Sequence, residues 1–444
     1  MGKLKIGDKV NMKFGGFVEI LEEFGAGGQG TVYRVKDKNN ECALKWYHNT
    51  HFKNEERLQK FYKNLEENIS KGAPNSVFLW PRELTTIQNG TFGYIMDIRP
   101  NGYNELTDFF VGSVTQKQVK FKSFSAIVNA AINIISGFRD LHNNGYSYQD
   151  INNGNFFINP NTGKVLICDN DNVAPYGTNL GILGKQRYMA PEVVRGDKDP
   201  DKLSDRFSLA VILFRLLFIN HPLEGKSSTP PCMTKELEKK YYGVEPRFIY
   251  DPNDKSNRPI PGTDANLKLF WNIYPDYIKE LFCRAFSKES MINTEARNQR
   301  PIEKEWLDSF LKLKSNIAKC PKCGQETFLK QNGENTCMEC KYKFNVVNSI
   351  KFLNSELPLM QGVKIMLWNI DSTSNDIETQ IAEVVANPKN PSLLGFKNVT
   401  NNIIWRVNLP DGSQRPLEPG KIVPIKKDFV IEFTSNSKDA GKVI

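Results

Sequence analysis

Four polar residues in the stretch from Tyr148 to Asp171 have the types and spacing needed for phosphoryl transfer. Asp150 is followed five residues later by Asn155. Two further acids, Asp169 and Asp171, come after the apolar run VLIC. One carboxylate can orient a hydroxyl nucleophile and accept its proton, while an amide and a second carboxylate can hold Mg²⁺ on a polyphosphate. The stretch therefore predicts a metal-dependent phosphoryl-transfer centre.

A glycine-rich run nearer the N-terminus could hold the phosphates. The sequence GAGGQGTVYRV places Gly25, Gly27 and Gly30 between stretches of alternating polarity, so a β-hairpin is expected here. Without a Cβ atom, the backbone of such a turn can approach a polyphosphate. Lys45, in the next strand-like run, can pair with the phosphates as a point charge. A glycine-rich hairpin alone is also typical of a simple turn, so this interpretation depends on the other motifs.

Together these motifs resemble the eukaryotic-type (Hanks-type) protein kinase domain, as found in bacterial serine/threonine kinases, over about residues 15–315. The A-P-E run ending at Glu192, Asp205 at the start of an apolar helix, and Arg300 before a proline extend the resemblance. It implies a bilobal α+β domain over residues 1–315, with an N-lobe at about 10–98 and a C-lobe at about 99–315. It also implies ATP and Mg²⁺ or Mn²⁺ as cofactors.

The resemblance assigns a role to each site residue. The implied catalytic residues are Asp150, Lys45 and Asn152. The implied magnesium ligands are Asn155 and Asp169, and Asp171 would be either a further metal ligand or a turn residue. The implied nucleotide-binding residues run from the glycine loop to the hinge: Gly25, Gly27, Gly30, Val32, Lys45, Glu66, Met96, Asp97, Arg99 and Glu105. The implied structural residues are Glu192, which pairs with Arg300, and Asp205.

Three departures from the family pattern concern regulation and rate. Gln149 replaces the arginine that captures a phosphate on the activation loop, and Thr178 is the only Ser or Thr between Asp169 and Glu192. We therefore expect activity without loop phosphorylation. Asn152 replaces a lysine that neutralises the transferring phosphate, so slower chemistry is expected. Lys185 replaces a threonine, which leaves the acceptor residue, Ser/Thr or Tyr, undefined.

These residues need particular elements to position them. A helix between residues 54 and 71 should present Glu66 or Glu67 to Lys45, but not both, because adjacent helical positions lie about 100° apart. The run FGYIMDIRP should be the last N-lobe strand and the hinge. Apolar stripes predict buried helices over 122–144 and 204–220. The polar region 221–262 is expected to be a C-lobe excursion without chemistry of its own, in which KELEKK forms a solvated helix.

Four cysteines follow the kinase-like region in two close pairs. Cys320 and Cys323 are separated by thirteen residues from Cys337 and Cys340. This C-x₂-C spacing predicts a zinc ribbon over 316–345, in contrast to four unrelated free thiols. With four thiolate ligands the zinc has no open position, so its role should be structural.

Short β-rich runs separated by turn signals predict an all-β sandwich over 346–444. Its last strands are similar to those of forkhead-associated domains. No arginine or S-x-x-H motif of a phosphothreonine pocket is evident, so a general protein-interaction module is favoured over a phosphopeptide-binding one.

Composition limits the function classes. The chain has 444 residues, 39% of them hydrophobic, and a net charge of +9 that forms no dense basic block, which argues against a nucleic-acid partner. The longest apolar run, Leu209 to Ile219, is too short to span a bilayer, and a cytoplasmic protein is expected. The sequence favours an active protein kinase with protein substrates over a pseudokinase that acts as a nucleotide-binding scaffold. The domain combination also looks like bacterial kinases of stress or phage defence.

Overall fold

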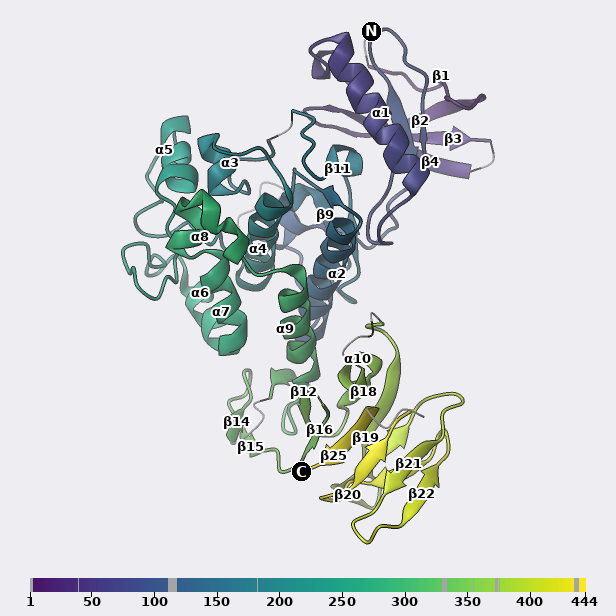
Figure 1. Cartoon of the computed structure of the whole chain (residues 1–444), viewed down its shortest axis with the longest axis vertical. Coiled ribbons are helices and arrows are strands. Elements are labelled where there is room, and N and C mark those ends of the chain that lie inside the picture. The colour runs from purple at the N-terminus through teal and green to yellow at the C-terminus, as the bar shows by residue number, and fades with distance from the viewer. Residues whose placement is uncertain are drawn as a thin grey trace. The chain divides into compact units, whose positions relative to one another are not determined.

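The computed structural model describes residues 3–38, 40–110, 118–181, 183–329, 334–353, 355–371, 374, 376–434 and 439–444, without the side chains of 265 and 266. The chain forms two compact units (Figure 1). Unit 1 comprises Met1–Lys122 and Asn129–Leu307, and unit 2 comprises Ser123–Val128 and Asp308–Ile444. The division falls within helix α9 (Glu303–Ser315), so the expected domain limits at 315 and 345 stay predictions.

The N-terminal lobe of unit 1 is one antiparallel sheet with a long helix. The strand order is β1-β2-β3-β4-β6-β5. The elements are β1 (Lys9–Asn11), β2 (Phe17–Ala26), β3 (Gly30–Asp37), β4 (Asn40–Tyr47), η1 (Asn49–His51), α1 (Glu55–Lys71), β5 (Glu83–Leu84) and β6 (Gly93–Met96). The expected hairpin, helix and last strand are all present.

Strand β4 separates two apolar cores because successive side chains point to opposite faces. Leu44 and Trp46 belong to the core on one face of the sheet. Ala43 and Tyr47 belong to the other, which also contains Leu58 and other apolar residues of α1. Lys45 alternates with Leu44 and Trp46, so it lies on the α1 side of the sheet.

The C-terminal lobe of unit 1 is mainly helical. Its helices are α2 (Phe124–Asn143), α3 (Pro191–Arg195), α4 (Lys202–Phe218), α5 (Lys235–Lys239), α6 (Ala265–Ile273), α7 (Asp276–Ala285), α8 (Lys288–Ile292) and the start of α9. Short strands and single turns lie between them: β7 (Asn104–Glu105), η2 (Leu106–Phe109), β8 (Tyr146–Ser147), η3 (Asn153–Asn155), β9 (Phe156–Ile158), β10 (Val165–Ile167), η4 (Asn170–Asn172), β11 (Ala174–Pro175), η5 (Lys240–Val244) and η6 (Thr294–Gln299).

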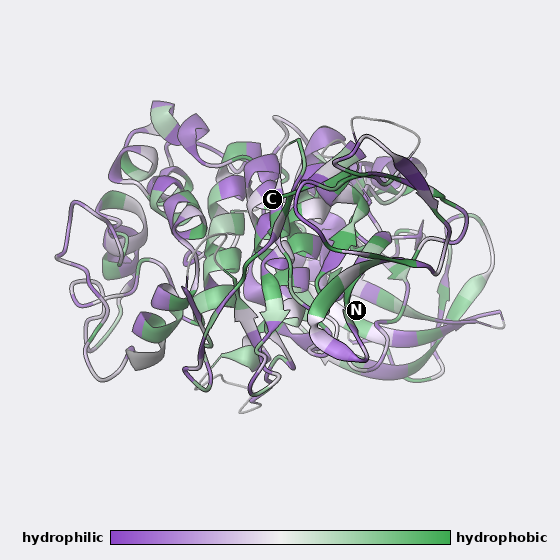
Figure 2. Cartoon of the chain, turned by 90° about the horizontal axis from the view of Figure 1, so that it is seen from below, coloured by the Kyte–Doolittle hydropathy of each residue, from purple (hydrophilic) through white to green (hydrophobic). Residues whose placement is uncertain are grey.

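Helix α4 is the centre of this lobe. Asp201 caps its N-terminus through the backbone N–H groups of Leu203 and Ser204, and most of its side chains are buried. Apolar and hydrophilic stretches alternate along the helices, as in helices with one buried face (Figure 2). Among the described helices, none combines the length and apolarity that crossing a bilayer requires. Unit 1 has the bilobal α+β fold that the sequence predicted.

The polar region after α4 is more ordered than its composition indicates. Helix α5 is solvated, as expected for KELEKK. However, buried Asn257 donates to the carbonyls of Leu223 (3.0 Å) and Arg247 (2.8 Å) and accepts from Ser227. One amide therefore holds together a segment with few apolar residues.

Unit 2 begins with the two hairpins of the expected ribbon. Strand β12 (Ile317–Lys319) pairs with β13 (Glu326–Phe328), and β14 (Glu334–Thr336) pairs with β15 (Lys343–Asn345). The ribbon is not isolated, because Ala318 and Leu329 lie in the apolar core of the sandwich that follows.

The remainder of unit 2 is a two-sheet β-sandwich. One sheet has the order β17-β16-β25-β24-β21-β22 and the other β18-β19-β20-β23. The elements are β16 (Ser349–Lys351), β17 (Glu356–Pro358), β18 (Lys364–Met366), α10 (Leu367–Ile370), β19 (Gln380–Asn387), β20 (Asn390–Asn398), β21 (Trp405–Asn408), β22 (Gln414–Leu417), β23 (Ile422–Pro424), β24 (Val430–Glu432) and β25 (Ala440–Val443). Both sheets contribute to one core around Ile365, Phe396 and Trp405.

Candidate active site

The backbone of the loop that carries Asp150 is fixed by Asp205 at the start of α4. The Asp205 carboxylate accepts hydrogen bonds from the backbone N–H groups of Tyr148 (2.6 Å) and Gln149 (3.0 Å). Gln149 has a φ of 71°, a left-handed conformation that is costly for a side chain other than glycine. The two hydrogen bonds to a buried carboxylate stabilise this turn and orient the following residue, Asp150.

Behind Asp205 lies a buried histidine, His142 of α2. Its Nε2 atom is 3.1 Å from Asp205 Oδ2, and its Nδ1 atom is 2.9 Å from Glu303 Oε1. Burial opposes protonation of His142, but the hydrogen bonds to the two carboxylates prevail and raise its pKa. Glu303, which also pairs with Arg206, is buried as well, yet His142 and Arg206 lower its pKa to about 2.

The loop brings Asp150, Asn152 and Asn155 together. The Asn152 side chain donates from Nδ2 to Asp150 Oδ1 (3.1 Å) and accepts at Oδ1 from Gly154 N (3.1 Å), which caps η3. Asn155 donates from Nδ2 to the Asp150 carbonyl (2.9 Å), so its amide oxygen is the atom that can bind a metal.

The Asp150 carboxyl is unusually hard to ionise. Burial raises its pKa to about 6, and the nearby carboxylates of Asp169 and Asp171 contribute in the same direction. The hydrogen bond from Asn152 and the charge of Lys185 oppose this shift. A carboxylate with a pKa near 6 is suited to act as a general base at neutral pH.

A second segment, Cys168–Asp171, adjoins this loop. The Cys168 N–H donates to the Asn155 carbonyl (2.8 Å), and the Tyr148 hydroxyl donates to the Cys168 carbonyl. Asp169 follows with a φ of 54° and a side chain that is 44% exposed. An exposed carboxylate next to Asn155 is in the right place to share a divalent cation with it.

Lys45 reaches this segment from strand β4. Its Nζ atom lies 2.7 Å from Asp171 Oδ2 and 3.3 Å from Asp169 Oδ1, and it also donates to Gln29 (3.1 Å). Asp171 is fully buried and its Oδ2 also accepts from the Tyr47 hydroxyl. Burial disfavours a charged lysine, but the two carboxylates raise the pKa of Lys45, so it stays an ammonium.

The expected pair between Lys45 and a helix glutamate is not formed in this structure. Glu66 is 44% exposed and pairs with Lys13, and Glu67 is exposed. The inward face of α1 instead carries Asn64 and Asn68, four residues apart, which donate to one backbone carbonyl at 2.9 and 2.8 Å. Glu66 lies about 200° around the helix from Asn64, so it cannot share that face.

Asp171 therefore has a role that the sequence did not indicate. The sequence suggested that Asp171 is a metal ligand or a turn residue. Its contacts show in addition that it pairs with Lys45. Its second oxygen, Oδ1, has no hydrogen-bond partner among the described residues. The sequence contained one indication of this arrangement. Asn64 and Asn68 lie on the same side of the helix as Phe61 and Leu65, so amides and apolar residues, and not the glutamates, occupy the buried face.

The glycine loop lies across the hairpin of β2 and β3, where Gly27 N donates to Gly30 O (2.8 Å). A Cβ atom on Gly25 would meet no atom within 4 Å, so the space beside this glycine is open. On Gly30 it would lie 2.3 Å from the Trp46 carbonyl, so that position must be glycine for close packing.

The other expected nucleotide-binding residues lie along β3, β6 and the hinge. Val32 pairs with Lys45 across β3 and β4, and Met96 packs in the α1-side core. Asp97 forms an exposed ion pair with Arg82, the Arg99 guanidinium lies 3.9 Å from the centre of the Phe157 ring, and the Glu105 carboxylate accepts from Thr107.

The segment from Asp169 to Glu192 is anchored at both ends. Gln149, which replaces the usual arginine, donates from Nε2 to the Thr178 carbonyl (2.6 Å). Its side chain is therefore bound to the backbone of the segment. At the far end Glu192 forms a buried bidentate pair with Arg300, with distances of 2.9 and 2.8 Å. The expected pairing of these two residues is present.

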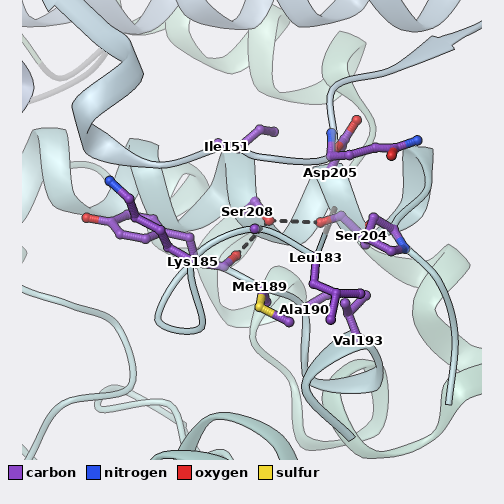
Figure 3. A pocket seen from close by; sticks show the side chains of 13 residues that line it. Ile151, Leu183, Lys185, Met189, Ala190, Val193, Ser204, Asp205 and Ser208 are labelled. Atoms are coloured by element: carbon purple, nitrogen blue, oxygen red, sulfur yellow. Dashed lines mark hydrogen bonds between the residues drawn. The ribbon is translucent and has the colours of Figure 1, made fainter. Parts of the chain in front are cut away.

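A small hollow of about 240 Å³, partly open to solvent, lies between this segment, the catalytic loop and α4. In Figure 3, Met189, Ala190 and Val193 lie together on one side, and Ile151 and Asp205 lie opposite them. The sequence did not predict this hollow, because its lining comes from three separate stretches.

The four cysteines of the ribbon converge. Their Sγ atoms all lie within 4.8 Å of one another, with Cys320 and Cys340 at 3.8 Å and Cys323 and Cys337 at 3.7 Å. Zinc–sulfur bonds of about 2.3 Å in a tetrahedron imply sulfur–sulfur distances of about 3.8 Å. The four cysteines thus fit a zinc ion.

The donor set near Asp150 also fits a divalent cation on a nucleotide. Asp169 and Asn155 offer hard oxygen atoms, Lys45 offers a fixed ammonium, and the space beside Gly25 is open.

Comparisons with known proteins agree with this geometry. The sequence model described as "Protein kinase domain" matches residues 18–260. Protein kinase YegI of Escherichia coli K12 is 21% identical over 331 residues, which cover 71% of this chain and 48% of that protein. Serine/threonine-protein kinase PrkC of Bacillus subtilis is 23% identical over 230 residues, covering 49% of this chain and 33% of PrkC. The chain thus spans half or less of these relatives.

Among solved structures, the Mycobacterium tuberculosis PknI kinase domain is similar, with 16% identity and a TM-score of 0.45. The match covers 70% of this chain and 98% of that one.

Proposed function

Because this chain belongs to the protein kinase domain family, we propose that it is an ATP-dependent serine/threonine kinase that phosphorylates protein hydroxyls. The observation that carries the proposal is the contact of Lys45 with Asp169, since it joins the N-lobe sheet to the segment that adjoins Asn155. A lysine, two candidate oxygen ligands for a metal and a candidate base are thus connected by these contacts.

Each residue of the candidate site has a separate role. Lys45 binds the phosphates by charge, and the backbone of the glycine loop approaches them. Asn155 and Asp169 would hold Mg²⁺, which would supply charge neutralisation to the phosphates. Asp150 orients the acceptor hydroxyl and takes its proton, which its pKa of about 6 permits at neutral pH.

The serine/threonine class is supported by the name of one relative, the serine/threonine-protein kinase PrkC. A pseudokinase that only binds nucleotide is the alternative function. It is disfavoured because Lys45, Asp150, Asn155 and Asp169 are all present and positioned by buried contacts, whereas a scaffold has no need to keep all four.

Purified full chain with Mg-ATP and a generic protein acceptor tests the proposal. Wild type should transfer labelled phosphate to serine or threonine, and Asp150→Asn should reduce the rate by about 10³-fold or more while binding Mg-ATP normally. Nucleotide binding without transfer, in both proteins alike, would identify a scaffold. Phosphoproteomics of the native host with and without Asp150→Asn would identify substrates and test the suggested role in stress or phage defence.

We also propose that the ribbon holds structural zinc and that the sandwich binds a protein partner. The four converging thiols and the shared core of ribbon and sandwich support the first. For the second, titration of the full chain with phosphothreonine peptides separates the two kinds of module. Binding would indicate a phosphopeptide module, and absence of binding would favour a general interaction surface.

A further inference from the structure

The catalytic loop contains no positive charge. From Tyr148 to Asn155 its sequence is YQDINNGN, with amides where a cation would be useful. A phosphoryl group in transfer carries charge spread over three oxygens, and a cation or fixed donors must stabilise it. Lys45 is held by Asp169 and Asp171, so its charge is already shared. A cation from another segment would add to the charge that Lys45 and a bound metal supply to the phosphoryl group.

Lys185, on the segment before A-P-E, reaches the loop. Its Nζ atom donates to Asn152 Oδ1 at 2.8 Å. The Nδ2 atom of the same amide donates to Asp150 Oδ1 at 3.1 Å, so one amide connects the ammonium to the base. The positive charge of Lys185 also stabilises ionised Asp150, which lowers its pKa against the effect of burial.

Hydrogen bonds fix the backbone at Lys185 and so define where its side chain begins. The Lys185 carbonyl accepts from Tyr188 N (2.8 Å) and Met189 N (3.1 Å). The Tyr188 carbonyl accepts from Ser208 Oγ of α4 at 2.6 Å. Ser208 and this part of the segment appear together in Figure 3. A side chain that starts from a rigid turn costs less entropy to align.

Two glycines let the segment and the loop approach each other. Gly184 has a φ of 87°, and a Cβ atom there would stand 3.1 Å from the Gln149 carbonyl and 3.5 Å from Asp150 Oδ1. A Cβ atom on Gly154 would lie 3.5 Å from Lys185 Nζ. Gly184 is thus needed both for its left-handed backbone and for the close approach.

We propose that Lys185 is a catalytic residue that supplies the transferring phosphoryl group with the positive charge that Asn152 cannot provide. This rests on the proposed kinase function. The bond between the γ-phosphorus and the ADP oxygen breaks as the bond to the acceptor hydroxyl oxygen forms, and the hydroxyl proton goes to Asp150. Lys185 stabilises the phosphoryl oxygens by charge and hydrogen bonding.

A charge-exchange series in the full chain tests this assignment. Lys185→Met should lower kcat about 10²-fold with little change in melting temperature, because loss of one fixed donor at a developing charge has effects of this size. Lys185→Arg should stay within about tenfold of wild type, because it keeps the charge. Lys198→Met, which removes an exposed lysine that follows helix α3, is the matched control and should be neutral.

A double variant moves the cation to the loop. Lys185→Thr alone should be as impaired as Lys185→Met, and adding Asn152→Lys should recover at least about tenfold in kcat, which a merely bracing role of Lys185 would not produce. If Lys185→Met keeps kcat within about threefold of wild type, or if the double variant is no faster than Lys185→Thr, the role of Lys185 is only structural.

Nucleotide binding gives a readout without turnover. Lys185→Met should weaken binding of Mg-ATP several-fold while leaving binding of Mg-ADP unchanged, because only ATP carries the γ-phosphate that Lys185 contacts. Equal effects on both nucleotides, or none on either, would overturn the assignment. A wild type without transferase activity would refute the proposed function instead, and the binding comparison would still decide the contact of Lys185.

Discussion

Lys45 keeps its ammonium in a buried position because two carboxylates of one short turn face it. The carboxylate nearest to it, at 2.7 Å, belongs to Asp171 and comes from the same segment as Asp169, the proposed metal ligand. The lysine is thus held without the help of a glutamate from α1. The roles of Lys45, Asp150, Asn155 and Asp169 stay predictions. Their motif positions were predictable from the resemblance to the kinase family, since such positions do not depend on packing. The partner of Lys45 was not, because it depends on which face of α1 is buried.

Loss of the Asp171 carboxylate should lower the folding stability of the protein. In Asp171→Asn the buried Lys45 loses its nearest counter-charge, and breaking a buried pair typically costs about 3 kcal/mol of folding free energy. Chemical denaturation should show this loss together with weaker Mg-ATP binding. Glu66→Gln is the matched control. It breaks only a partly exposed pair with Lys13 and should change stability by less than about 1 kcal/mol. Equal effects of the two variants would contradict the role of Asp171.

The pH dependence of activity should report Asp150. Its pKa of about 6 means that the carboxyl is protonated below that pH and cannot accept the proton of the acceptor hydroxyl. We expect kcat/KM to fall about tenfold per pH unit below pH 6 and to level off above pH 7. Steady-state rates in buffers of constant ionic strength and Mg²⁺ concentration would measure this. A flat profile between pH 5 and 7 would exclude Asp150 as the base.

At the scale of elements, three helices meet at one buried histidine. His142 of α2 contacts Asp205 of α4 and Glu303 of α9, and Asp205 in turn holds the catalytic loop. Helix α9 was not predicted, but α2 and α4 could be predicted from their apolar stripes, and the β2–β3 hairpin from its glycines. The contact of His142 could not, because its two partners are 63 and 161 residues away in the chain.

This network should make stability depend on pH in a defined direction. The pKa of His142 is raised on folding, so its contribution is complete below the unfolded value of about 6.5 and is lost as the pH rises through the folded pKa. His142→Gln should lower the free energy of unfolding by about 2 kcal/mol at pH 6, and the difference from wild type should shrink at higher pH. Urea titrations at several pH values measure it, and a constant difference would contradict a charged His142.

The segment between Asp169 and Glu192 should not need phosphorylation. The position of the usual phosphate-binding arginine is occupied by Gln149, which donates to the backbone of Thr178 and carries no charge. Thr178→Ala should therefore retain activity within about twofold of wild type, in a kinase assay of the dephosphorylated chain. Loss of activity in a correctly folded Thr178→Ala variant would show that the segment is switched after all.

At the scale of the whole chain, the four-cysteine ribbon and the sandwich share a core within unit 2, while the candidate active site belongs to unit 1. The ribbon was predictable because cysteine spacing encodes a metal site directly. Its packing on the sandwich was not, because Ala318 and Leu329 are ordinary apolar residues in the sequence.

Removal of the metal should destabilise unit 2 as a whole. Metal analysis should give about one zinc per chain, and Cys323→Ser with Cys340→Ser should abolish it. Because the ribbon contributes to the sandwich core, the same variant should lower the melting temperature of unit 2, with Cys232→Ser, an exposed cysteine outside the ribbon, as control. Nucleotide binding should be retained. An unchanged melting profile after complete zinc loss would show that the sandwich is stable without it.

The amide of Asn170 has a consequence for inhibitors. It stands between Asp169 and Asp171, and its Nδ2 atom donates to the carbonyls of Leu79 (2.8 Å) and Ile167 (2.9 Å). A compound that opens this turn would have to break both hydrogen bonds. Selective ligands for this chain should therefore leave the hydrogen bonds of Asn170 intact and contact Lys45 or Lys185 from the proposed nucleotide site.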